Sequence, residues 1–251
     1  MNDLGAPIPP VPAAPEKSSS FLANLMDIYF SPGEAFQNLL RKPAFLVPMA
    51  LHLALSLGFT AIWLQKTDGK AFIKARMEES GRMDKIPAER LDEILSTQAR
   101  YFPAIAWGGG ALGPPLVVLI LAGVFLFVYR FFYSSEVSFS QSLTIVASTF
   151  AALALISTPL VLGVLALKGD WTIAPQEALQ ANLSLLLEKQ TASKPLWTLL
   201  ASLDLFVFWV IFLLAAGFGA ASKRNWSGAL AGIVVPWALW VIGKVGISFV
   251  F

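Results

Sequence analysis

Two charged residues, Asp204 and Lys244, stand inside long apolar runs near the end of the sequence, and Arg224 lies in a polar turn twenty residues from each. Antiparallel helices joined at this turn would place both charges at one depth, where hydrocarbon tolerates a charge only if it is paired or hydrated. We therefore predict an intramembrane ion pair, either as a structural link between helices or as a proton or ion relay. The alternative is that Lys244 extends toward the headgroups while Asp204 bonds locally.

His52 is the only histidine, and it lies inside the first apolar run of a chain that has no cysteine. One imidazole cannot complete a metal site without further strong ligands, and a lone base needs a nucleophile that the sequence does not identify. We expect His52 to hydrogen-bond to a neighbouring helix, with pH sensing as an alternative role. The sequence predicts no catalytic residue, no metal ion and no cofactor.

The stretch Gly108 to Gly113, GGGALG, matches a dinucleotide-binding string, but an apolar run surrounds it and two prolines follow it. Such a string binds a dinucleotide only between a strand and a helix. Small residues four apart instead favour close approach of membrane helices, and prolines inside helices favour kinks. The residues predicted to pack helices are Gly109, Gly113, Gly228 and Gly232, the last two opposite Ala216 and Ala220, and the predicted kinks are at Pro114, Pro159 and Pro236.

Composition decides the class of protein. Hydrophobic residues make up 56% of the 251 residues and charged residues 14%, which is too apolar for an ordinary soluble domain. The net charge of +2 lacks the concentrated basic face that nucleic acids require, so we predict no nucleic-acid partner. The absence of cysteine excludes disulfides and thiol chemistry.

Five apolar segments are long enough to cross a hydrocarbon core about 30 Å thick, which takes about 20 residues of helix. Helices satisfy their own backbone groups in lipid, so we predict an all-α bundle of five transmembrane helices. The connections alternate long and short, which places both long loops on one side, where their amphipathic helices form a small cap. The predicted spans are 44–64, 104–129, 143–167, 196–221 and 226–250, with cap helices at 71–79, 87–101 and 175–189.

Residues 21–43 precede the first span and follow a Pro-rich tail, residues 1–20, that we predict to be disordered. The pattern predicts amphipathic helices in the headgroup region. Ser31 stands at an N-cap, Pro32 at the first helical position and Glu34 three residues after the cap, which predicts a capping box. The basic pair Arg41 and Lys42 then precedes the first span of the transmembrane domain, 44–251.

The segment FSPGEAFQNLLRKPAFLVPMAL, residues 30–51, resembles the start of bacterial members of the Ypt-interacting-protein (Yip) family. This resemblance covers residues 21–251 and implies five spans, an inner-membrane location and a cytoplasmic N-terminus, which the distribution of Lys and Arg alone does not decide. Eukaryotic relatives are thought to bind small GTPases of the Ypt/Rab type. Their acidic motif has only a loose counterpart here, ALGPPL at residues 111–116, which lacks the acidic residue.

Two functions fit these observations. The first is a non-enzymatic membrane protein that organises lipids or membrane partners, including a possible membrane-protein or small-GTPase-like partner. The second is a small transporter or permease subunit with a polar site near Asp204 and Lys244. A membrane enzyme that uses Asp27, Ser31 or Glu34 ranks third, since the start of a helix explains these residues better.

Overall fold

The computed structural model describes residues 21–188 and 192–249, so the predicted tail at residues 1–20 lies outside the described residues. Its regular elements are helices, and one isolated bridge joins Asn182 to Asp204. In chain order they are α1 (Phe21–Phe30), α2 (Pro32–Arg41), α3 (Leu46–Lys66), α4 (Gly69–Glu79), η1 (Met83–Lys85), α5 (Ala88–Phe131), α6 (Phe139–Lys168), α7 (Pro175–Ala178), η2 (Leu183–Leu186), α8 (Lys194–Ser202), α9 (Leu205–Ser222) and α10 (Trp226–Ile247).

Five of these helices, α3, α5, α6, α9 and α10, are long and apolar enough to cross a membrane, which confirms the predicted all-α bundle with five spans. The fourth span is shorter than predicted. The chain leaves the helix after Ser202 and begins α9 at Leu205, so the segment expected at 196–221 is divided into α8 and α9. Asp204 stands at this division, and its side chain caps the new helix.

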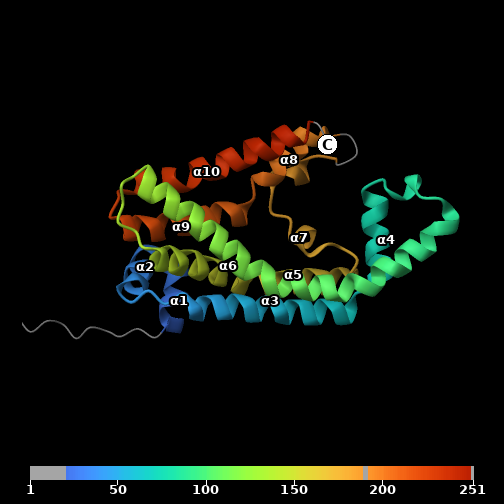
Figure 1. Ribbon diagram of the computed structural model, residues 1–251, viewed down its shortest axis with the longest axis horizontal. Helices are drawn as coiled ribbons and strands as arrows, with labels where there is room; N and C mark the ends of the chain where they lie inside the picture. The colour runs from blue at the N-terminus through green and yellow to red at the C-terminus, as the bar shows by residue number, and fades with distance from the viewer. Residues whose placement is uncertain (1–20, 189–191, 250–251) are drawn as a thin grey trace, which may run out of the picture.

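The two long connections lie at one end of the bundle, as predicted, and the short α5–α6 and α9–α10 turns lie at the other end with α1 and α2 (Figure 1). We call these the long-loop end and the short-turn end. α4 forms close to where it was expected, whereas the helix predicted at 87–101 is the first part of the continuous 44-residue helix α5. The prediction of one helix at 175–189 is wrong, because the described part of that range, 175–188, holds only α7 and η2, of four residues each.

An ion pair joins the two long connections to each other. Arg76 Nη1 of α4 lies 2.8 Å from Glu177 Oε2 of α7 and also pairs with Glu79 within its own helix. The Thr67 hydroxyl donates to the Trp171 carbonyl over 3.2 Å. Beneath them a small apolar cluster contains buried Trp63 of α3 and residues of α6 and α7. The cap is therefore built mainly by the first connection, and the second is tied to it.

We predict that Arg76→Gln loosens this attachment without unfolding the bundle. The pair is about a third exposed, so its loss is expected to lower the free energy of unfolding by less than about 1 kcal/mol. Hydrogen exchange of amides in 175–187 should nevertheless speed up, since the loop loses its charged anchor. The matched control is Lys74→Gln, whose partner Glu78 lies in the same helix. Equal exchange in the two variants would contradict the attachment.

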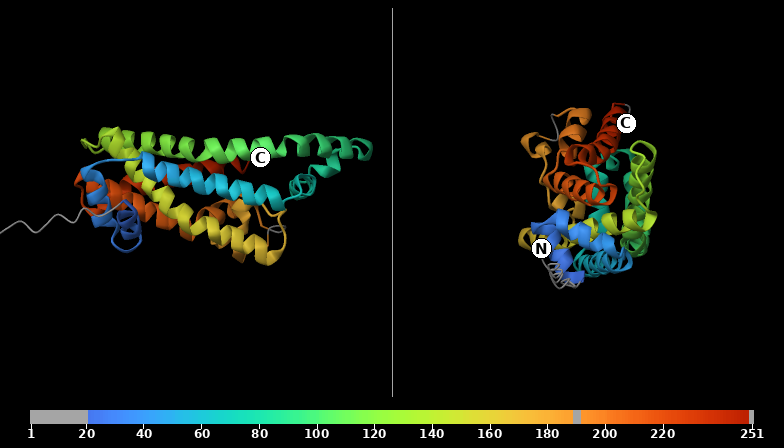
Figure 2. Two further views of the ribbon diagram at one scale, coloured as in Figure 1. Left: turned by 90° about the horizontal axis from the view of Figure 1, so that it is seen from below. Right: turned by 90° about the vertical axis from the view of Figure 1, so that its left-hand side faces the viewer.

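The main apolar core lies toward the short-turn end and includes the N-terminal helices. Leu25 and Ile28 of α1 and Phe36 of α2 are buried against α6 and α9. The helices α1 and α2 thus lie against one end of the bundle (Figure 2). The apolar face that the sequence assigned to the headgroup region is thus packed on protein. The Tyr29 hydroxyl donates to the Ala152 carbonyl in the middle of α6 over 2.7 Å, and burial raises the pKa of Tyr29.

The start of α2 differs from prediction in one respect. Ser31 occupies the N-cap and Pro32 the first turn, as expected, but no side-chain hydrogen bond caps the helix, so the predicted capping box with Glu34 is not formed. A complete capping box begins α6 instead. There the Ser138 hydroxyl accepts from the Gln141 amide and the Gln141 side chain accepts from the Ser138 amide. Packing of Phe36, not a capping box, fixes α2 in place.

Candidate functional site

Asp204 and Lys244 lie at the long-loop end of the last two spans and bond to different partners. The Asp204 carboxylate accepts from the backbone amides of Phe206, at 2.8 Å, and Val207, at 3.3 Å, which lie in the first turn of α9 and so have no acceptor within the helix. Lys244 Nζ of α10 donates to the Ser202 hydroxyl over 2.8 Å. These two separate interactions replace the ion pair that the sequence predicted between the residues.

A backbone bridge supports the break between α8 and α9. The Leu205 amide donates to the Ala181 carbonyl over 3.0 Å, and the Leu183 amide donates to the Leu203 carbonyl over 3.3 Å. Non-helical backbone near lipid is stable only where such partners exist. Asp204 therefore starts a span at its edge and is no charge at mid-depth, which removes the reason for expecting it to need a cation.

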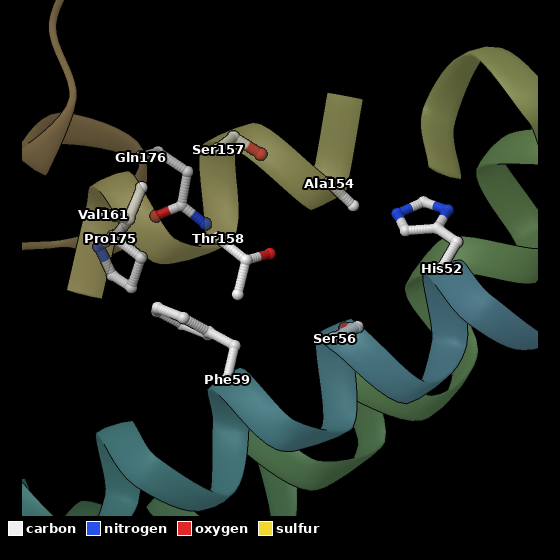
Figure 3. Close-up of a pocket in the computed structure, with 9 residues that line it drawn as sticks. All are labelled: His52, Ser56, Phe59, Ala154, Ser157, Thr158, Val161, Pro175 and Gln176. Carbon is white, nitrogen blue, oxygen red and sulfur yellow. The ribbon is translucent and has the colours of Figure 1, made fainter. Parts of the chain in front are cut away.

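A polar pocket of about 250 Å³ lies between α3 and α6, below α7 (Figure 3). The His52 ring stacks on Phe150 with centroids 6.0 Å apart, and its buried Nδ1 has no hydrogen-bond partner, so the expected bond from this atom to a neighbouring helix is not formed. The Ser56 hydroxyl donates to the Gly110 carbonyl of α5 over 2.9 Å. The remaining lining residues are Phe59, Ala154, Ser157, Thr158, Val161, Pro175 and Gln176.

This pocket offers hydrogen bonds from one imidazole, a few hydroxyls and one amide. That set suits water or a small uncharged solute. Within the described residues no group of three or more His, Cys, Asp or Glu side chains could hold a metal ion. The transport interpretation places a polar site at Asp204 and Lys244, but neither residue lines this pocket.

The glycines that bring helices together are only partly those predicted. A methyl group on Gly110 would meet the Thr60 hydroxyl of α3 at 2.5 Å, whereas one on Gly109 or Gly113 would meet nothing within 4 Å. Helix packing through Gly109 and Gly113 is therefore wrong, and Gly110 takes that role. Gly228 belongs to the start of its own helix, where its amide donates to the Asn225 side chain over 3.1 Å.

Gly232 does pack closely, and its nearest neighbour is Tyr129 of α5. A methyl group on it would lie 2.9 Å from the hydroxyl and ring of Tyr129. The buried Tyr129 hydroxyl donates to the Ala229 carbonyl over 2.6 Å, and its ring stacks on Phe218 of α9 at 4.7 Å. This contact joins α5 to α10 near the short-turn end, and we call it the Tyr129–Gly232 contact. The three prolines predicted as kinks, Pro114, Pro159 and Pro236, lie inside α5, α6 and α10.

Beyond the Tyr129–Gly232 contact, α5 and α10 diverge toward the long-loop end (Figure 1). The space between them is a groove of about 810 Å³, with α6 and α9 contributing to its walls. Its lining is apolar throughout. We call it the α5–α10 groove, and its lining includes Val124, Phe150, Val210, Pro236, Trp237 and Trp240.

The sequence analysis missed this groove, although one signal for its α10 side was available. Trp237, Trp240 and Lys244 recur at intervals of three and four residues, which places them along one face of a helix. An aromatic pair that leads to a cation is typical of a helix face at the edge of a membrane. Only the three-dimensional structure shows that this face borders a concave surface.

Comparison with known families shows which family the chain belongs to. The sequence matches the Yip1 domain over residues 26–247, from α1 to the last residue of α10. Searches of curated proteins and of solved structures give no significant match. The match covers most of the chain and all five candidate spans. The protein is therefore a member of the Yip1-domain family of multi-pass membrane proteins.

Proposed function

We propose that this protein is a non-enzymatic, bacterial-type Yip protein that organises lipids or other membrane proteins at its lipid-facing surface. One observation carries the proposal: the α5–α10 groove, a concave apolar surface at membrane depth. Exposed apolar side chains are ordinary on a membrane protein. A groove of several hundred cubic ångströms with a uniformly apolar lining is the form that binding sites for apolar molecules take.

The family relationship supports a binding role with an N-terminus in the cytoplasm and a place in the inner membrane. The candidate catalytic side chains have other surroundings. Ser31 is the N-cap residue of α2, Glu34 lies in its first turn, and the imidazole of His52 stacks on an aromatic ring. A small-GTPase-like partner rests on resemblance alone, since ALGPPL at residues 111–116 lies within α5 and lacks the acidic residue.

Site-specific photocrosslinking in the groove tests the proposal. We expect a photoreactive benzophenone amino acid at Leu239, which lines the groove, to capture a lipid or a protein that remains bound after detergent extraction. The matched control is the same amino acid at Ile242 of the same helix. The two side chains have similar exposure, 64% and 67%, but Ile242 does not line the groove. Mass spectrometry of the adducts is the measurement, and equal capture at both positions would contradict the proposed function.

A further inference from the structure

We infer that the α5–α10 groove binds one anionic phospholipid, with an acyl chain in the groove and the phosphate at Lys244. The inference rests on the proposed function, because it names the occupant of the same groove. The depth of the groove, its closed end and the charge at its open end point to this occupant.

The groove is about as deep as one leaflet of a bilayer. α10 begins at the short-turn end with Trp226, and at 1.5 Å per residue Ile233 lies about 10 Å and Trp240 about 21 Å along the helix. Lys244 follows at about 27 Å, near the far boundary of a hydrocarbon core about 30 Å thick. On α10 the groove therefore begins about a third of the way across the membrane, just short of its middle, and runs toward the headgroups on the long-loop side.

The closed end of the groove selects a lipid over a partner helix. A transmembrane helix of a partner must cross the whole hydrocarbon core. In this groove it would meet the Tyr129–Gly232 contact, where the two helices are too close for even one added methyl group. An acyl chain needs only one leaflet and can end before the contact. The uniformly apolar lining suits such a chain.

The open end carries the charge that a phosphate requires. Lys244 continues the helix face of Trp237 and Trp240 one turn beyond the groove. Its ammonium group has three donors, and one of them bonds to the Ser202 hydroxyl. Asp204 lies two residues after Ser202, but its carboxylate accepts hydrogen bonds from two amides at the positive end of α9, which offsets its charge. An anionic headgroup therefore finds a positioned cation.

Native mass spectrometry of the full-length protein in detergent, after removal of endogenous lipid, tests the inference. The probes are dioleoyl phosphatidylglycerol and dioleoyl phosphatidylcholine at equal concentration, with inorganic phosphate as a separate competitor. We expect the wild type to retain the phosphatidylglycerol about fivefold better, the effect of one lysine near a membrane surface. Lys244→Gln should abolish this preference and Lys244→Arg should keep it. Lys66→Gln, at the same end of the bundle, should leave it unchanged.

A second pair of variants separates the groove from the charge. Val124→Trp fills the groove and should lower retention of both lipids, whereas Val117→Trp changes a residue of the same helix and similar exposure, 41% against 42%, outside the groove. Equal retention of the two lipids by the wild type, an unchanged preference in Lys244→Gln, or displacement by inorganic phosphate would overturn the inference. If Val124→Trp still lowers retention of both lipids, the proposed function stands. Capture of a protein at Leu239 would likewise overturn the inference that a lipid occupies the groove, while it would support the proposed function of organising membrane partners.

Discussion

Replacing Tyr129 with alanine is expected to lower the free energy of unfolding by about 3 to 5 kcal/mol, the range for removing a large buried aromatic side chain. Tyr129 is fully buried where α5, α9 and α10 meet, stacks on Phe218 and bonds to Ala229. Its removal leaves a cavity beside Gly232, which has no side chain of its own to fill it. Unfolding of the purified protein in increasing SDS, followed by tryptophan fluorescence, measures the loss.

Two further variants test the reason for that loss. Tyr129→Phe keeps the ring and removes only the hydroxyl, so it should lower the free energy of unfolding by about 1 kcal/mol. Tyr101→Ala removes the same type of side chain from an exposed position of α5 and should have little effect. A similar loss in Tyr101→Ala and Tyr129→Ala would show that the Tyr129–Gly232 contact is not a centre of stability.

Phe36→Ala is expected to detach α1 and α2 from the bundle. Phe36 is fully buried in the main core, so its truncation should destabilise the docked state of these helices by about 3 to 5 kcal/mol. The measurement uses Leu39→Cys, a buried position in a chain that has no other cysteine. Maleimide labelling of this cysteine in membranes should be slow in the single variant and at least tenfold faster when Phe36→Ala is added, since 1.4 kcal/mol already corresponds to a tenfold change.

The control for this experiment is Phe30→Ala in the same pair of helices, whose side chain is 81% exposed. It removes an equal apolar area without removing core packing, so labelling at Leu39→Cys should not change. If both truncations accelerate labelling equally, the two helices are held by the membrane surface and not by the bundle. The experiment thereby distinguishes docking on protein from the interfacial placement that the sequence pattern first indicated.

The fold could be predicted because the length and polarity of helices follow directly from the thickness of a bilayer. The placement of α1 and α2 and the role of Asp204 were harder to predict from the sequence. A helix with one apolar face has the same pattern whether that face meets lipid or protein, which is why α1 and α2 were assigned to the headgroups. Asp204 was treated as a charge in mid-span because the apolar run continues past it, although Asp before such a run is also a typical N-cap.

The candidate site was less predictable than the fold. The spacing of small residues shows that they share a face of a helix, but it does not show which way that face points. The spacing therefore favours Gly109 and Gly113, whereas in the structure the neighbouring Gly110 faces α3. The α5–α10 groove depends on the angle between two helices that are distant in sequence, and no local pattern encodes that angle. Lys244 stands out in the sequence as a charge inside an apolar run, but its partner Ser202 could not be identified because the sequence pattern does not predict the break after α8.

That break has a consequence for the membrane around the protein. α9 has 18 residues, so it is about 27 Å long, while α10 with 22 residues reaches about 33 Å. A hydrocarbon core of about 30 Å is thicker than α9, and the lipids beside it must compress or the helix must expose polar ends, at a fraction of a kcal/mol per ångström. We expect this hydrophobic mismatch to thin the bilayer locally beside α9.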